Sequence, residues 1–235
     1  MEGIKMKKHY QLFFSIVLLV GFTLVGIFCV DAQESKAKEK IKFLVISEGK
    51  DILYAMPADE RRKIEDATTN LLKQDVKAGA ILEFYNIPGW NRTVAVEQYE
   101  SVEALYKHFE GHPIYPYTKF EVYPLRKSET QTEGAEQAKP DAKMKFLVIA
   151  EAKDILYSMP ADERMKLEEA NSEYMSQLEK AGDFLESYDI PGWNRSACIE
   201  HYRSIEELYK HFDGYPGYPY TKFEVYPLIE SDIMN

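Results

Sequence analysis

The sequence predicts an α+β fold in which two ferredoxin-like repeats pack sheet to sheet as one intrachain dimeric α/β barrel. Two segments, 41–125 and 144–228, align without a gap at a constant offset of 103, and about 55 of the 85 aligned positions are identical. Each segment has the pattern β-α-β-β-α-β, which gives a four-stranded antiparallel sheet with both helices on one face. The other face of each sheet would be bare, and the second repeat is available to cover it.

The first strand and first helix of each repeat are indicated by local sequence. Residues 42–48 form a short apolar run with β-branched side chains, which is typical of a strand. Pro57 and the acidic residues after it suit the first turn of a helix, and Gly79 lies where a C-terminal cap is expected. The same signals recur 103 residues later, although Asp75 interrupts the apolar stripe of the first copy where the second has Leu178.

The second half of each repeat contains three further elements. Residues 80–87 and 92–100 are predicted to form strands two and three, joined by a tight Pro-Gly turn. Ser101 is a typical N-cap for a helix that ends near Gly111. A segment rich in Tyr and Pro then leads into strand four at 118–124. The corresponding elements of the second copy lie 103 residues further along.

The N-terminal segment, 1–32, is predicted to be a signal peptide. A basic start is followed by the apolar run 12–30 and by a cleavage site after Ala32. The run is also long enough to span a bilayer, so an uncleaved signal anchor is the alternative. Both interpretations place the folded part outside the cytoplasm, as a secreted, periplasmic or membrane-anchored protein. The other segments outside the repeats are a spacer at 33–40, a flexible linker at 126–143 and a C-terminal tail at 229–235.

The composition limits the classes of partner. The net charge is −10, which argues against nucleic-acid binding, because phosphate backbones require clustered Lys and Arg. The two cysteines, Cys29 and Cys198, form no metal-binding spacing, so a structural zinc site is not expected. The expected partners are a small-molecule ligand and further copies of the chain, with membrane contact only through an uncleaved N-terminal segment.

Two motifs carry a resemblance to a known family. The helix start Ser101–Leu105 and the segment Pro113–Val122 resemble muconolactone delta-isomerases, and the similarity extends over each repeat. The resemblance implies a dimeric α/β barrel that assembles further, and an enzyme that shifts a lactone double bond by moving a proton without metal or cofactor. Trp90 and Trp193 stand where members of that family have a histidine.

Carboxylates on the strands are the candidate bases. Allylic proton transfer needs a base of near-neutral pKa and a donor to the enolate oxygen that forms. Burial in an apolar cavity raises the pKa of a carboxyl group into that range. The catalytic candidates lie on or beside strands three and four: Glu97, Glu200, Glu121, Glu224, Tyr117 and Tyr220. The alternative is that these carboxylates face solvent and these tyrosines pack around a rigid turn.

A second group of residues is expected to bind the substrate. Arg92 and Arg195 would clamp a carboxylate, and the neighbouring tryptophans would form a cavity wall. The substrate-binding candidates are Trp90, Arg92, Trp193, Arg195, Tyr115, Tyr218 and His201. The alternative is a hairpin tip with a solvated arginine. His108 and His211, near the end of the second helix, are interpreted as surface charges that favour the helix dipole.

Three functions remain open from the sequence. The first is an exported isomerase that moves a proton on a small lactone or oxygenated ring compound through a carboxylate base. The second is a non-catalytic binding or assembly module of the same fold, which the tryptophans at the histidine positions favour. The third is a cofactor-free monooxygenase, since related families on this fold include such enzymes.

Overall fold

A computed structural model describes residues 40–128, 144–181 and 184–234. The predicted signal segment, the spacer up to residue 39 and the linker from residue 129 to residue 143 lie outside these ranges. Within them, no helix has the length and apolar character needed to cross a membrane.

The first half of the barrel has the predicted strands and helices, with additions. Its elements are β1 (Ile41–Gly49), α2 (Asp51–Ala55), α3 (Ala58–Lys77), β2 (Ile81–Ile87), β3 (Arg92–Tyr99), α4 (Val102–Glu110), the 3-10 turn η1 (Tyr115–Tyr117) and β4 (Thr118–Lys127). The short helix α2 was not predicted, and β4 continues three residues beyond the expected strand. The start of the predicted linker is therefore part of a strand.

The second half repeats this order. Its elements are β5 (Met144–Ala152), α5 (Asp154–Tyr157), α6 (Ala161–Ala181), β6 (Phe184–Ile190), β7 (Arg195–Tyr202), α7 (Ile205–Gly214), η2 (Tyr218–Tyr220), β8 (Thr221–Glu230) and η3 (Asp232–Met234). Helix α7 includes the glycine that was expected to end it. The predicted C-terminal tail contributes two residues to β8 and all of η3.

Local sequence explains where the helices begin and end. Asp59 and Glu60 lie in the first turn of α3, where the dipole favours negative charge. Gly79 follows α3 with φ +68, a conformation that glycine adopts without steric cost. Ser101 caps α4, because its hydroxyl accepts a hydrogen bond from the backbone N–H of Ala104 at 3.1 Å.

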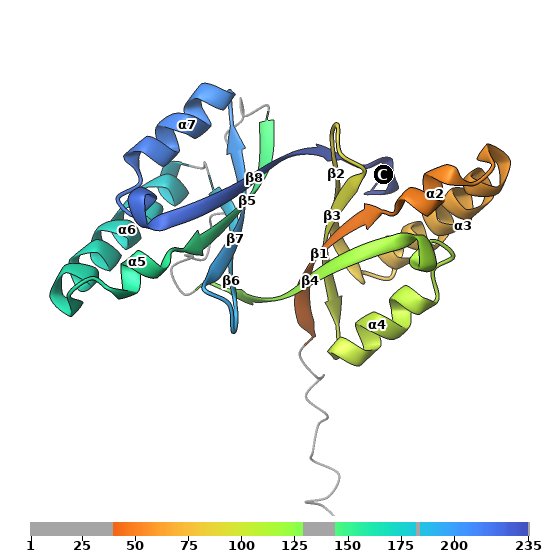
Figure 1. Ribbon diagram of the computed structural model, residues 1–235, viewed down its shortest axis with the longest axis horizontal. Helices are drawn as coiled ribbons and strands as arrows, with labels where there is room; N and C mark the ends of the chain where they lie inside the picture. The colour runs from red at the N-terminus through yellow and green to blue at the C-terminus, as the bar shows by residue number, and fades with distance from the viewer. Residues whose placement is uncertain (1–39, 129–143, 182–183, 235) are drawn as a thin grey trace, which may run out of the picture. The chain divides into compact units, whose positions relative to one another are not determined.

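The eight strands close into one antiparallel barrel in the order β1-β3-β2-β8-β5-β7-β6-β4. The two four-stranded sheets therefore face each other, as predicted, but they are also joined at both edges. One seam pairs Tyr85 with Glu230, and the other pairs Arg126 with Asp189. At both seams the pairing residues of β4 and β8 lie in the parts of these strands that extend beyond the predicted ends. Figure 1 shows the helices of each half on the outside of this barrel.

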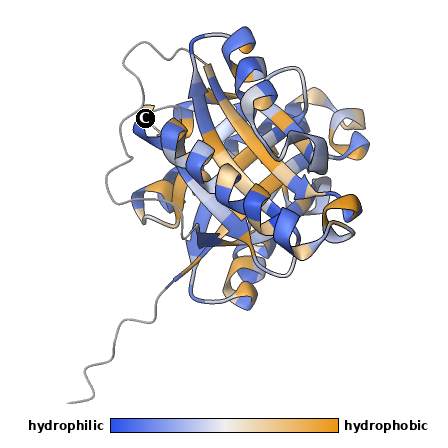
Figure 2. Ribbon diagram, turned by 90° about the vertical axis from the view of Figure 1, so that its left-hand side faces the viewer, coloured by the Kyte–Doolittle hydropathy of each residue, from blue (hydrophilic) through white to orange (hydrophobic). Residues whose placement is uncertain are grey.

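Alternation along the strands separates two kinds of core. Leu44, Val94 and Val96 point into the barrel, where buried side chains of both halves pack together. Phe43 and Ala95, one residue removed, face the helices of the first half. In Figure 2 the hydrophobic residues concentrate along the central strands, while the helices carry both kinds of residue. The barrel interior is therefore filled, and space for a ligand lies on the helix side.

The C-terminal turn η3 belongs to the core of the first half. Ile233 and Met234 pack against the helix-side cluster of that half, which includes Leu72 of α3 and Phe84 of β2. Figure 1 shows the C-terminus beside β2. The first half therefore gains apolar contacts from a segment that follows the second half in the chain.

Candidate functional site

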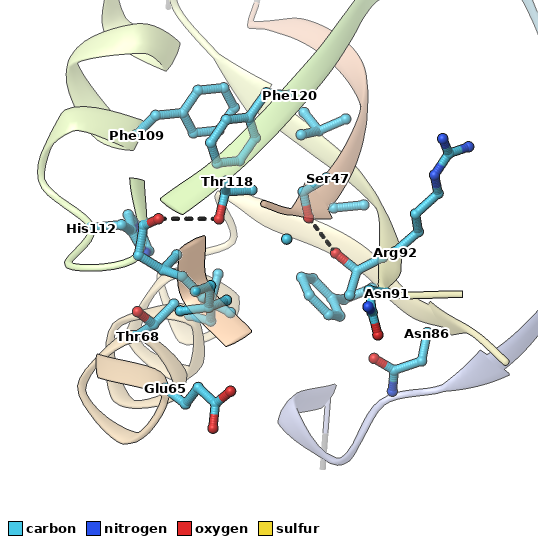
Figure 3. A pocket seen from close by; sticks show the side chains of 18 of the residues that line it. Ser47, Glu65, Thr68, Asn86, Asn91, Arg92, Phe109, His112, Thr118 and Phe120 are labelled. Atoms are coloured by element: carbon cyan, nitrogen blue, oxygen red, sulfur yellow. Dashed lines mark hydrogen bonds between the residues drawn. The ribbon is translucent and has the colours of Figure 1, made fainter. Parts of the chain in front are cut away.

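A cavity of about 340 Å³ lies in the first half, between the sheet and helices α3 and α4. Apolar side chains form much of its wall, and Phe109 and Phe120 stack there with ring centroids 4.4 Å apart. Figure 3 shows these rings at one side and Asn86, Asn91 and Arg92 at another. The polar groups that reach the cavity include Ser47, Thr68, Thr93, Glu97, His108, His112 and Thr118. A mainly apolar cavity with a few convergent polar groups is typical of a small-molecule site.

Glu97 is the buried acid of this cavity. It lies on β3 opposite Phe43 of β1 and Ile81 of β2, so apolar residues flank it on both sides. Its exposed fraction is 4%, and among the described residues its Oε2 has no hydrogen-bond partner of good geometry, although the hydroxyl of Tyr99 lies close enough to act on it. Burial raises the pKa of Glu97 to about 7; the hydroxyl of Tyr99 opposes this rise and the charge of Asp75 adds to it. The group therefore exchanges its proton near neutral pH.

Two histidines and an aspartate meet at the helix side of the same cavity. His108 on α4 and His112 just after it place their Nε2 atoms 2.9 Å apart. The Oδ2 atom of Asp75, on α3, lies 3.3 Å from Nε2 of His108 and 3.4 Å from Nε2 of His112. Burial lowers the pKa of both imidazoles despite the charge of Asp75, and the neighbouring ring of His108 lowers the pKa of His112 further. Both histidines are therefore neutral near pH 7.

Hydroxyl groups supply hydrogen-bond donors along the cavity. The Oγ of Ser47 and the Oγ1 of Thr93 are 2.5 Å apart, and Thr118 donates to the backbone carbonyl of Ile114 at 3.1 Å (Figure 3). Two hydroxyls that share one hydrogen bond retain a second hydrogen. The Ser47–Thr93 pair can therefore donate to an oxygen of a bound molecule.

The predicted Trp-Arg clamp lies at the end of the cavity, but its arginine has a partner in the chain. Arg92 donates to Oε2 of Glu48 from Nε at 2.8 Å and from Nη2 at 2.6 Å. Its guanidinium lies 5.3 Å from the ring of Trp90, which is 55% exposed. The second half repeats both contacts with Arg195, Glu151 and Trp193. The ion pair of each arginine therefore links the first and third strands of its half.

The second half has a different interior. Glu200 is 2% exposed, but the hydroxyl of Tyr202 donates to its Oε2 at 2.8 Å. Tyr174 stacks on His211 and donates to its backbone carbonyl at 2.8 Å. A cavity of about 480 Å³ in this half is lined by residues of β5, α5, α6 and β7, by the turn that holds Trp193 and by the segment that leads into β8. Among the described residues its wall does not include Glu200. The two predicted bases are thus in unlike surroundings.

The carboxylates of the fourth strands lie away from both cavities. Glu121 and Glu224 share a strand face with Tyr123 and Tyr226, which pack against the barrel interior and donate to them at 3.2 and 3.0 Å. That face is opposite to the one that carries Glu97. His201 also points toward the barrel, and burial lowers its pKa to about 4, with the charge of nearby Lys145 acting in the same direction.

The tyrosines before the fourth strands are mainly packing residues. Tyr115 stacks on Phe120 at 5.8 Å, and its counterpart Tyr218 stacks on Phe223 at 5.9 Å while 45% exposed. Tyr117 is half-buried outside the wall of the first cavity, whereas Tyr220 lines the second.

The interpretation of His108 and His211 as surface charges is wrong. His211 is buried, and burial lowers its pKa to about 4, whereas His108 is half-buried against Asp75. Asp75 and His112 were not singled out as site residues. The available signal was that both differ between the halves, since Leu178 and Tyr215 stand at the matching positions.

Comparison with known sequences identifies one family. The family model described as muconolactone delta-isomerase matches residues 144–232. The muconolactone delta-isomerase of Acinetobacter baylyi is 32% identical to this chain over 71 residues, which is 30% of this chain and 74% of that protein.

Comparison with solved structures identifies the fold. A mutant chlorite dismutase from Candidatus Nitrospira defluvii has a TM-score of 0.58 at 11% identity, covering 83% of this chain and 92% of that one. Another mutant of that enzyme, in complex with cyanide, has a TM-score of 0.59 at 9% identity, and the match covers 85% of this chain and 93% of that one. At such identities the likeness concerns the fold alone.

Proposed function

Because the chain belongs to the muconolactone delta-isomerase family, we propose that its first half moves a proton on a small lactone or related oxygenated ring compound. The observation that carries the proposal is the carboxyl group of Glu97, which is buried and also lines a cavity of about 340 Å³. In this proposal Glu97 is the base.

The chemistry requires only groups already present in the cavity. Glu97 in its ionised form takes a proton from the saturated ring carbon next to the double bond that is conjugated with the lactone carbonyl, and the electron pair moves through that double bond into an enolate on the carbonyl oxygen. The protonated Glu97 then returns the proton to a different ring carbon, which shifts the double bond. A hydroxyl of the Ser47–Thr93 pair is placed to donate to the enolate oxygen. A base with a pKa of about 7 suits such a transfer at neutral pH.

The second half is proposed to have a supporting role. We regard it as a copy of the first half, because the two segments are so similar in sequence. In this copy the hydroxyl of Tyr202 donates a hydrogen bond to Glu200, and Tyr174 stacks on His211. Glu200 would then be a buried structural acid.

The experiment compares matched variants in the two halves. The full chain is mixed with a muconolactone-type butenolide in deuterated buffer, and loss of ring proton signals is followed by NMR. We expect protein-dependent exchange that Glu97→Gln abolishes and Glu200→Gln leaves largely intact. Exchange that survives in Glu97→Gln would refute the assignment of the base.

The same spectra address the non-catalytic alternative. A lactone that shifts protein signals from the cavity without exchanging its own protons would identify a binding module. Consumption of dissolved oxygen with a phenolic substrate would instead point to the cofactor-free monooxygenase.

From the sequence we also propose that the barrel lies outside the cytoplasm. The basic and apolar start of the chain supports export or membrane anchoring with the barrel outside the cytoplasm. Further association of barrels, as the family resemblance implies, would be tested by light scattering of the purified chain.

A further inference from the structure

Three side chains on the helix side of the cavity have the arrangement of a metal-binding triad. We propose that Asp75, His108 and His112, here called the Asp-His-His cluster, bind a divalent first-row transition metal ion. Two imidazoles and one carboxylate suit Zn²⁺ or Fe²⁺. The inference does not depend on the proposed isomerase activity.

The distances within the cluster fit a single ion. The Nε2 atoms and the Oδ2 atom form a triangle with sides of 2.9, 3.3 and 3.4 Å. An ion about 2.1 Å from each of these atoms would lie about 1 Å out of their plane, which is the geometry of three ligands on one face of a coordination sphere. The cluster therefore needs little rearrangement to accept an ion.

The local chemistry also favours a cation. The two Nε2 atoms face each other and can share only one proton, so at least one of them presents a lone pair. The Oδ2 atom of Asp75 is buried and, among the described residues, has no hydrogen-bond partner of good geometry. Three potential ligand atoms thus lie within reach of one ion, and burial keeps both imidazoles in the neutral form, which ligates a metal once the shared proton moves to Nδ1 or to solvent.

The position of the cluster relates it to the cavity. His108 and His112 lie on the cavity wall, as Glu97 does, whereas Asp75 lies behind them on α3. Three protein ligands leave coordination positions open for water or a ligand oxygen. The ion would therefore lie at the edge of the space where a small molecule binds.

The second half provides a natural comparison. At the matching positions it has Leu178, His211 and Tyr215, so it retains one of the three ligands. Asp75→Leu and His112→Tyr therefore introduce residues that the same fold already accommodates.

The test measures metal binding directly on the full chain, without substrate. Protein freed of metal with EDTA and dialysed is titrated with Co²⁺, whose visible d–d absorption reports coordination, and with Zn²⁺ by calorimetry. We expect about one strong site per chain. The double variant Asp75→Leu/His112→Tyr should bind at least about 100-fold more weakly, because it lacks two of the three ligands.

Two further variants make the outcome decisive. Asp75→Asn keeps the size of the side chain and removes its charge, so it should fold and should bind the metal ion more weakly. This variant therefore tests the proposal even if the double variant does not fold. Glu97→Gln should bind Co²⁺ as the wild type does while losing proton exchange, which separates this inference from the proposed function. The absence of a Co²⁺ band in the wild type, or equal affinity in wild type and Asp75→Asn, would overturn the proposal.

Discussion

Replacement of Glu97 by glutamine is expected to stabilise the folded chain, and to do so more strongly at high pH. The pKa of Glu97 is about 7 in the folded chain against an ordinary 4.5, so its ionised form is about 3 kcal/mol less stable there than in the unfolded chain. Because the folded state holds this proton more tightly, stability is lost as pH rises from 4.5 through 7. Glutamine cannot ionise, and the variant does not lose this stability.

Urea unfolding at pH 5 and pH 9 would measure the effect. The gain in unfolding free energy of Glu97→Gln over wild type should be about 2 to 3 kcal/mol larger at pH 9 than at pH 5. Asp75 and Tyr99, the two groups that act on the pKa of Glu97, remain in both proteins, so the difference isolates the carboxyl. Glu110→Gln, at an exposed position of α4, is the control and should show little pH dependence. Parallel pH profiles for wild type and Glu97→Gln would refute the buried-base reasoning.

Three other predictions concern activity, packing and titration. On metal-free protein, the rate of lactone proton exchange should rise as pH increases through about 7, because Glu97 acts in its ionised form; a rate that is flat from pH 5 to 9 would contradict this. Phe109→Ala should lower the unfolding free energy, measured by urea denaturation, by about 3 to 4 kcal/mol, since the residue is 4% exposed and its ring stacks on Phe120. A much smaller loss would show that neighbouring side chains fill the space that the ring leaves. NMR titration of His211 should show a neutral imidazole until about pH 4, so that stability falls as pH drops from 6.5 toward 4; a midpoint near 6.5 would disprove its burial.

Most of the fold was predictable from local patterns. The alternation along β1 and β3 separates barrel and helix faces, and proline, serine and glycine mark where the helices begin and end. The extra residues of β4 and β8 were not predicted, because they pair with strands of the other half and nothing in their own sequence requires it. The short helices α2 and α5 have too few residues to show a period.

The candidate site was only partly predictable. Glu97 was found because its position on a strand among apolar residues is a local feature. The contact of Asp75 with His108 joins two helices 33 positions apart, and no spacing rule indicates it. Likewise, the sequence could not show that Arg92 is bound to Glu48, because that ion pair depends on the register of β1 against β3.

The turn η3 affects how far the molecule can be dissected. Ile233 and Met234 cover apolar side chains beside α3 and β2, although they follow the second half in the chain. A fragment ending at Lys127 would lose this cover and would also leave β2 and β4 as open sheet edges, which invite pairing with other chains. The halves resemble each other as sequences, but each half excised alone would carry two unpaired edge strands, so we expect it to associate with other chains rather than to persist as a smaller monomer.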